Sequence, residues 1–115
     1  MASKQSERRR FPRRFCSLLV QLRPPGQAYP TNCETTDISL CGCYVKLLSP
    51  LPVGTVVDMR VRTGDTEVKV QGVVKTSNPG LGNGIDFLDM APASRLQLQH
   101  YLETIPDVKA PEFIP

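Results

Sequence analysis

The sequence predicts an all-β fold, a six-stranded antiparallel β-barrel with one C-terminal α-helix. Apolar and polar residues alternate through most of the region 16–87, turn-forming residues separate the alternating runs, and one amphipathic helical pattern follows them. Alternation with a period of two is typical of antiparallel strands that have one face in water. About six short strands at this spacing indicate a sandwich or a small barrel, and we interpret them as a barrel with the helix packed on it. A chain of 115 residues, of which 40% are hydrophobic, is expected to form one domain with an adequate core.

Five alternating runs define the expected strands. Clusters of Gly, Pro, Asn and Asp separate them, and the Thr-Gly-Asp sequence at 63–65 predicts a tight hairpin. The runs span residues 16–23, 42–48, 56–63, 67–75 and 84–87. The side chains expected to face the core are Cys16, Leu18, Val20, Leu22, Cys43, Val45, Leu47, Val57, Met59, Val61, Val68, Val70, Val74, Ile85 and Phe87.

A different pattern follows the last strand. Between Pro92 and Ile105, apolar residues recur at the spacing of one helical stripe, with a proline in the first turn and Pro106 after the last turn. Residues 106–115 are expected to be a C-terminal tail and residues 1–6 a disordered N-terminal tail. The domain itself is therefore expected to span residues 7–105.

Positive charge is concentrated at the N-terminus. The first fourteen residues hold six of the fourteen Lys and Arg residues against one acid, a local charge of +5, whereas the other 101 residues have a net charge of −2. Few apolar groups and strong mutual repulsion predict that residues 1–14 are not strongly ordered in the free protein. Residues 1–14, here called the arm, are therefore a candidate for binding an anion.

Several classes of chemistry have no residues to support them. The four cysteines (Cys16, Cys33, Cys41 and Cys43) are interpreted as buried free thiols, with Cys41 and Cys43 on one face of a strand. The lone histidine, His100, has no catalytic or zinc-binding companion, so we expect no enzyme, no metal and no cofactor. The sequence shows no apolar segment of the kind found in signal peptides or membrane spans, and we expect a cytoplasmic protein without membrane contact.

Two short motifs remain to be explained. R-x-x-x-R occurs as Arg9 and Arg13, or one place on as Arg10 and Arg14, and it precedes D-x-S-x-x-G, formed by Asp37, Ser39 and Gly42. Taken alone, the second motif indicates a strand-ending turn in which Asp and Ser bond the local backbone and Gly has a positive φ.

Together, in this order and on this architecture, the two motifs resemble those of the PilZ family of cyclic di-GMP receptor domains. Gly84 and Phe87 resemble a later G-x-x-F strand of the family, and the similarity covers residues 7 to about 105. The resemblance implies a bacterial signalling protein that binds this second messenger and passes the signal to a partner protein, as a monomer or homodimer. The site residues that it implies are Arg8, Arg9, Arg10, Arg13, Arg14, Asp37, Ser39, Gly42 and Gly84.

The chemistry of the ligand agrees with these residue types. An arginine fork matches a phosphate or the O6/N7 edge of guanine. Of the two registers, the resemblance favours Arg9 and Arg13 as the motif pair, since RRFPR is similar to the commoner spelling in the family. A fixed carboxylate at Asp37 can accept from the N1 and N2 donors of guanine, Ser39 can add a polar contact, and Gly42 can allow close approach of the backbone. Arg8 could stack on a second guanine.

Two other functions fit parts of the sequence. A basic arm can bind nucleic acid by counterion release, but the rest of the chain is acidic and has few aromatic residues for stacking. A protein–protein adaptor could keep the fold without the ligand, although the intact arginines and Asp37 argue against such a loss.

Overall fold

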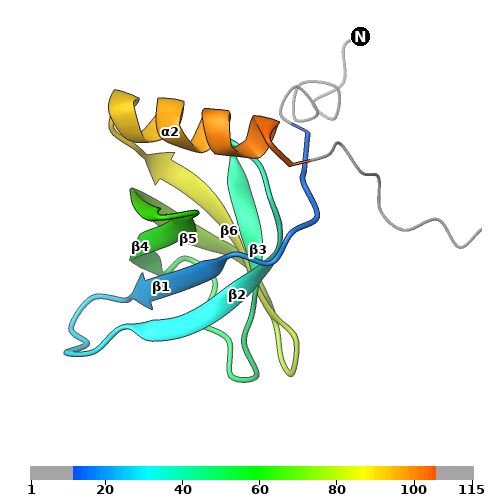
Figure 1. The fold of residues 1–115 in the computed structure, drawn as a ribbon. Helices are drawn as coiled ribbons and strands as arrows, with labels where there is room; N and C mark the ends of the chain where they lie inside the picture. Colours follow the sequence, from blue (N-terminus) through cyan, green and yellow to red (C-terminus); the bar gives the residue numbers. More distant parts are fainter. Residues whose placement is uncertain (1–11, 106–115) are drawn as a thin grey trace, which may run out of the picture.

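The computed structural model describes residues 12–105, which form a closed antiparallel β-barrel with a helix across one end (Figure 1). The strand order around the barrel is β1-β2-β3-β6-β5-β4, and every neighbouring pair is antiparallel. The predicted six-stranded barrel with a C-terminal helix is confirmed. The elements are β1 (Leu19–Arg23), β2 (Thr31–Ile38), β3 (Gly42–Lys46), β4 (Val56–Thr63), β5 (Thr66–Asn78), β6 (Gly82–Asp89) and α2 (Pro92–Glu103).

Apolar side chains fill the interior of the barrel. Val57, Met59 and Val61 on β4 are at most 1% exposed, as the alternation of that strand predicts. Of the other side chains predicted to face the core, most are buried, while Cys16, Leu47 and Phe87 pack at its margin. A six-stranded barrel filled in this way has no room for a ligand inside, so binding sites must lie on its outer surface.

Strand β2 is the one strand that the alternation did not locate. Its sequence is mostly polar, and Thr35 is fully buried among apolar residues. The Thr35 hydroxyl is satisfied there, since it accepts a hydrogen bond from the Leu18 N–H at 2.9 Å and donates one to the Cys16 carbonyl at 2.6 Å. These two bonds replace the solvation that the threonine lost, and they attach the chain before β1 to β2.

The predicted hairpin and helix are both present. Gly64, with a φ of 67°, lies in the two-residue turn that joins β4 to β5. Helix α2 begins with Pro92 in its first turn and buries Leu98 and Leu102. The Gln97 amide donates hydrogen bonds to the hydroxyls of Thr63 and Thr66, which fastens the helix to this hairpin. Within residues 12–105, no helix has both the length and the apolar character that a membrane crossing requires.

The four cysteines form no disulfide and lie in three different environments. Cys33 and Cys43 are buried and Cys16 is partly buried. Burial raises the pKa of Cys33 to about 11 and also raises the pKa of Cys43. The prediction that Cys41 is buried on the same face as Cys43 is wrong, because Cys41 lies exposed in the turn before β3 rather than in a strand.

Candidate functional site

A β-bulge at Thr36 decides the direction of the Asp37 side chain. In the β2–β3 pair, Thr35 lies opposite Val45 and Asp37 lies opposite Tyr44, so the register shifts by one residue. Directly opposed residues of an antiparallel pair share a face of the sheet. Thr35 therefore faces the interior with Val45, whereas Asp37 is turned to the outer face with Tyr44.

The segment before β1 pairs with this part of β2. Arg14 donates its N–H to the Ile38 carbonyl at 2.8 Å and accepts the Ile38 N–H at 3.0 Å, which forms an isolated antiparallel bridge. Figure 1 shows the segment, in blue, running from the helix end of the barrel toward β1. The bridge lays the backbone of the arginine-rich segment along β2, directly beside Asp37.

This attachment corrects one expectation. Arg13 and Arg14 were predicted to be part of an arm that is not strongly ordered in the free protein, and for these two residues the prediction is wrong. Backbone hydrogen bonds to the end of β2, beyond its pairing with β1, outweigh the repulsion between the arginines. Arg8, Arg9 and Arg10 lie outside the described residues, as do the predicted tails at residues 1–6 and 106–115.

Arg13 and Asp37 form an ion pair. The Arg13 Nη1 lies 3.5 Å from the Asp37 Oδ1, and the Arg13 side chain is 70% exposed while that of Asp37 is only 11% exposed. The Thr36 hydroxyl donates a hydrogen bond to Asp37 Oδ2 at 3.1 Å. Burial raises the pKa of the neighbouring Cys16 thiol, and the negative charge of Asp37 raises it further.

Asp37 Oδ1 is an unsatisfied acceptor. It is buried and accepts no hydrogen bond from any of the described residues, so its only interaction there is the ion pair at 3.5 Å. An unpaired buried polar group costs about 1–3 kcal/mol, and more when it is charged. A molecule that brings N–H donors to this oxygen would therefore recover that cost.

Ser39 and Gly42 shape the connection between β2 and β3. Ser39 Oγ accepts a hydrogen bond from the Cys41 N–H at 3.0 Å, and the Ser39 N–H donates to the Gly42 carbonyl at 2.8 Å. The prediction that Ser39 bonds the local backbone is confirmed.

The positive φ expected for Gly42 is absent. A Cβ at this position would instead overlap the carbonyl oxygen of Ile85 on β6. The position that a Cβ would take at Gly42 is therefore occupied by the neighbouring strand. The glycine is needed because β3 and β6 pack closely at this point.

Gly84 lies in the same row as Asp37. The strand registers place Asp37 opposite Tyr44, Tyr44 opposite Gly84, and Gly84 opposite Thr76. At a spacing of about 4.8 Å between strands, Asp37 and Gly84 are roughly 10 Å apart. A side chain at Gly84 would overlap the Thr76 hydroxyl, which accepts the Gly84 N–H at 3.0 Å.

The sequence analysis did not name Tyr44 as a site residue. Its ring lies on the outer face between Asp37 and Gly84, and its hydroxyl donates to Asn78 Oδ1 at 2.8 Å. The signal was available, because the alternation that points Cys43 and Val45 inward must point Tyr44 outward. The outer row thus presents a carboxylate, an aromatic ring and a glycine side by side.

The remaining chemistry-bearing residues are not gathered at this site. His100 is exposed on α2. Within the part of the chain that the structure describes, no group of three or more His, Cys, Asp or Glu residues is arranged to hold a metal ion.

Comparison with known families identifies this arrangement. A family model described as the PilZ domain matches residues 7–104. The chain belongs to the PilZ family. This family consists of cyclic di-GMP receptor domains, which are generally non-catalytic and interact with partner proteins. No curated protein matches the sequence.

Two solved structures share the PilZ fold of this protein. One is the inhibitor of motility MotI/DgrA of Bacillus subtilis, with a TM-score of 0.66 and 19% identity; the likeness covers 90% of this chain and 56% of that protein. The other is the PilZ domain of CeSA from a cellulose-synthesizing bacterium, with a TM-score of 0.62 and 21% identity, covering 79% of this chain and 97% of that domain. At these identities the likeness concerns the fold.

Proposed function

We propose that this protein is a cyclic di-GMP receptor that binds the nucleotide on the outer face of β2 and β3, between Arg13 and Asp37. Membership of the PilZ family supports the ligand class. The observation that carries the proposal is the buried Asp37 Oδ1, which has a cation beside it and no hydrogen-bond donor among the described residues.

Guanine offers the groups that this pair lacks. Its N1–H and N2 amino groups are donors, and the carboxylate of Asp37 can accept both hydrogen bonds. One of them satisfies Oδ1, and the other goes to Oδ2, which also accepts from the Thr36 hydroxyl. Arg13 is exposed, so its guanidinium can turn to the O6/N7 edge of a guanine or to a phosphate while the backbone of Arg14 stays bridged to Ile38.

Other residues of the site complete the contact. Arg8, Arg9, Arg10 and Arg14 supply further forks for the two phosphates and for stacking on a guanine. Ser39 Oγ accepts the Cys41 N–H, so its own proton remains available to the ligand.

The outer row of Asp37, Tyr44 and Gly84 adds an apolar contact surface to these polar contacts. The ring of Tyr44 offers a stacking surface, and the neighbouring Gly84 carries no side chain that would displace the Thr76 hydroxyl packed against it. Gly42 acts indirectly, because it allows β3 to pack against β6 and so holds the row in place.

The signal follows from closure of the arm. Binding neutralises arginines that otherwise repel one another, so the arm folds over the nucleotide and creates a surface that exists only with ligand. A partner protein reads this surface. The role is that of a non-catalytic receptor.

Calorimetric titration tests the proposal, with cyclic di-GMP against cyclic di-AMP, GTP and cyclic GMP. A site made for guanine edges leaves its own polar groups unpaired when adenine enters, so cyclic di-AMP should bind far more weakly. Equal affinity for the two dinucleotides would refute guanine recognition. Binding of none of the four would favour the ligand-free adaptor, and tight binding of unrelated oligonucleotides would favour the nucleic-acid function.

Limited trypsin digestion tests the closure of the arm. Saturating cyclic di-GMP should strongly slow cleavage after Arg8, Arg9 and Arg10, with the bond after Lys109 as an internal reference. Unchanged cleavage at full occupancy would remove these arginines from the site.

A further inference from the structure

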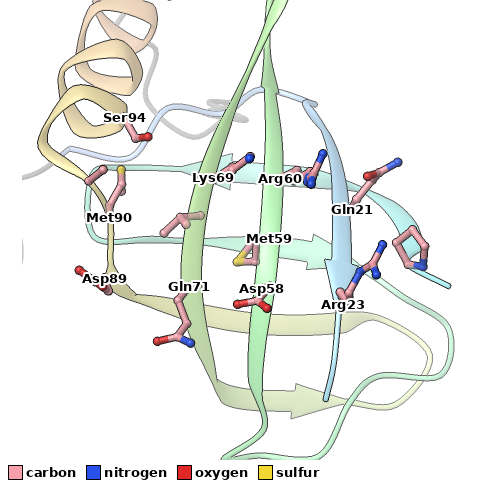
Figure 2. A pocket seen from close by; sticks show the side chains of 13 residues that line it. Gln21, Arg23, Asp58, Met59, Arg60, Lys69, Gln71, Asp89, Met90 and Ser94 are labelled. Carbon is pink, nitrogen blue, oxygen red and sulfur yellow. The ribbon is translucent and has the colours of Figure 1, made fainter. Parts of the chain in front are cut away.

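A second surface feature lies on the wall formed by β1, β4 and β5. It is a hollow of about 620 Å³ that also touches the start of α2, and it shares no residue with the proposed nucleotide site (Figure 2). This volume is within the range of about 300–1,000 Å³ that is usual for ligand pockets. Its lining is mostly polar and includes both basic and acidic side chains.

Two rows of side chains cross the hollow. The strand registers place Gln21 opposite Arg60 and Arg60 opposite Lys69, and Figure 2 shows these three side chains in one row. The next row places Arg23 opposite Asp58 and Asp58 opposite Gln71. Arg60 and Lys69 are thus like charges in directly opposed positions, which destabilises a sheet. A pair of this kind is accounted for if it binds an anionic group.

Most of these side chains have no partner within the described part of the protein. Arg60 has one ion pair, with Glu67 at 3.7 Å. Arg23 and Asp58 are opposed in register, yet they form no ion pair. The lining side chains without any hydrogen bond or ion pair to other described residues include Gln21, Arg23, Asp58, Lys69, Gln71 and Asp89.

The charge of this wall differs from that of the rest of the chain. Residues 15–115 carry eight basic and ten acidic side chains. Four of the eight basic residues are nevertheless gathered on this one wall, where each is exposed. They are Arg23, Arg60, Arg62 and Lys69. Three acids, Asp58, Glu67 and Asp89, lie on the same wall or line its hollow, so the basic residues exceed the acidic ones by one.

We propose that this wall binds an acidic polypeptide segment of the partner protein. A Glu or Asp side chain would pair with Arg60 and Lys69, while amide groups of the peptide would bond the two glutamines. Asp58 and Asp89 line the same hollow, so an occupant must place its negative charge at Arg60 and Lys69 and neutral groups beside the two acids. A peptide with spaced acidic residues can do this, whereas a nucleic acid carries a charge at every phosphate, and no aromatic side chain lines the hollow to stack on bases. The wall is a second contact with the partner, present with or without the nucleotide, and because the partner itself belongs to the proposed function, this inference rests on that function. Peptide binding itself needs no nucleotide, so the peptide-binding proposal and the nucleotide-binding proposal can be tested and refuted separately.

The test is a titration of the ¹⁵N-labelled full chain with a short synthetic peptide in which Glu alternates with Ser, followed by NMR. Two further probes are the same peptide with Gln in place of each Glu and a single-stranded oligonucleotide of equal length. The Glu peptide should shift the amide signals of Arg60 and Lys69 saturably, and the Gln peptide should bind at least tenfold more weakly. Absence of saturable shifts at these amides, or tighter binding of the oligonucleotide, would overturn the proposal.

Two charge-reversal variants on one strand provide the matched control. Lys69→Glu and Lys75→Glu change the net charge equally, and both residues are exposed on the outer face of β5, about 20 Å apart at the usual rise of a strand. Lys69→Glu should weaken the Glu peptide at least tenfold and Lys75→Glu less than twofold. Equal losses would show nonspecific attraction and overturn the proposal. The affinity for cyclic di-GMP should be unchanged in both variants. If the unmodified protein did not bind cyclic di-GMP at all, that result would contradict the proposed nucleotide site but not the peptide site.

Discussion

Asp37→Asn separates the two roles that the structure gives to this carboxylate. In the free protein, Asp37 forms an ion pair with Arg13 at 3.5 Å, and the Arg13 side chain is 70% exposed. Asp37 is buried, but water reaches the Arg13 end of the pair, and this screening and the entropy of the long side chain limit the contribution of the pair to about 0–1 kcal/mol. Asn has nearly the same shape, so the substitution should lower the free energy of unfolding by at most about 1 kcal/mol, or roughly 4 °C in Tm.

Affinity for cyclic di-GMP should change much more. The carboxylate accepts from two guanine donors, whereas Asn offers one acceptor and an amide that repels one of those donors. Losing a hydrogen bond to a charged group costs about 1.5–3 kcal/mol, which corresponds to about 10- to 100-fold in affinity. Calorimetry measures the affinity, and thermal unfolding of the same samples measures the stability.

A matched control is available in the β4–β5 turn. Asp65 is exposed and makes no contact with the proposed site, so Asp65→Asn removes the same charge and should leave both affinity and Tm unchanged. The reasoning fails if Asp37→Asn binds cyclic di-GMP as tightly as the unmodified protein. It also fails if the variant has lost so much stability that unfolding accounts for the weaker binding.

Three further outcomes follow from individual residues. Arg13→Lys keeps the charge but loses the planar fork, so it should weaken cyclic di-GMP binding about tenfold where Arg62→Lys has no effect; equal affinities would contradict a bidentate contact. Gly42→Ala should lower the free energy of unfolding by about 1–3 kcal/mol in urea denaturation, because the added Cβ overlaps the backbone of β6, and an unchanged midpoint would contradict this packing. The free energy of unfolding should decline as pH rises from 9.0, the ordinary thiol pKa, through about 11, because the unfolded chain loses the Cys33 proton before the folded protein does. Cys33→Ala should reduce this decline, and an identical pH profile would argue against the raised pKa.

Alternation was sufficient to predict five of the six strands because their inner faces are apolar. Val57, Met59 and Val61 show the reason, since no other arrangement buries all three while leaving their polar neighbours in water. Strand β2 was not predicted because its sequence is mostly polar and a polar residue, Thr35, occupies a core position. Its burial depends on hydrogen bonds to residues seventeen and nineteen positions away, which a local pattern cannot contain.

The motifs predicted the contact between Arg13 and Asp37, whereas the structural role of Gly42 differs from the expected turn. The motifs paired Arg13 with Asp37 across 24 positions, and the two side chains do meet. Gly42 was assigned a turn and a ligand, whereas the structure shows contact with β6. A glycine needed for packing and a glycine needed for binding look the same in one sequence, so only the neighbouring strand distinguishes them.

The bulge at Thr36 links the fold to the proposed function. Because the interior of the barrel is filled, a nucleotide must bind outside, and an acid on an outer wall would ordinarily be solvated. Two features make Asp37 different: the bulge turns it outward, and the bridge from Arg14 to Ile38 brings the preceding segment, with Arg13, beside it. The carboxylate is buried yet gains no hydrogen bond at Oδ1 from the described residues. The bulge thus positions the acid and the bridge positions its cation, so together they form a buried acceptor with a positive charge beside it.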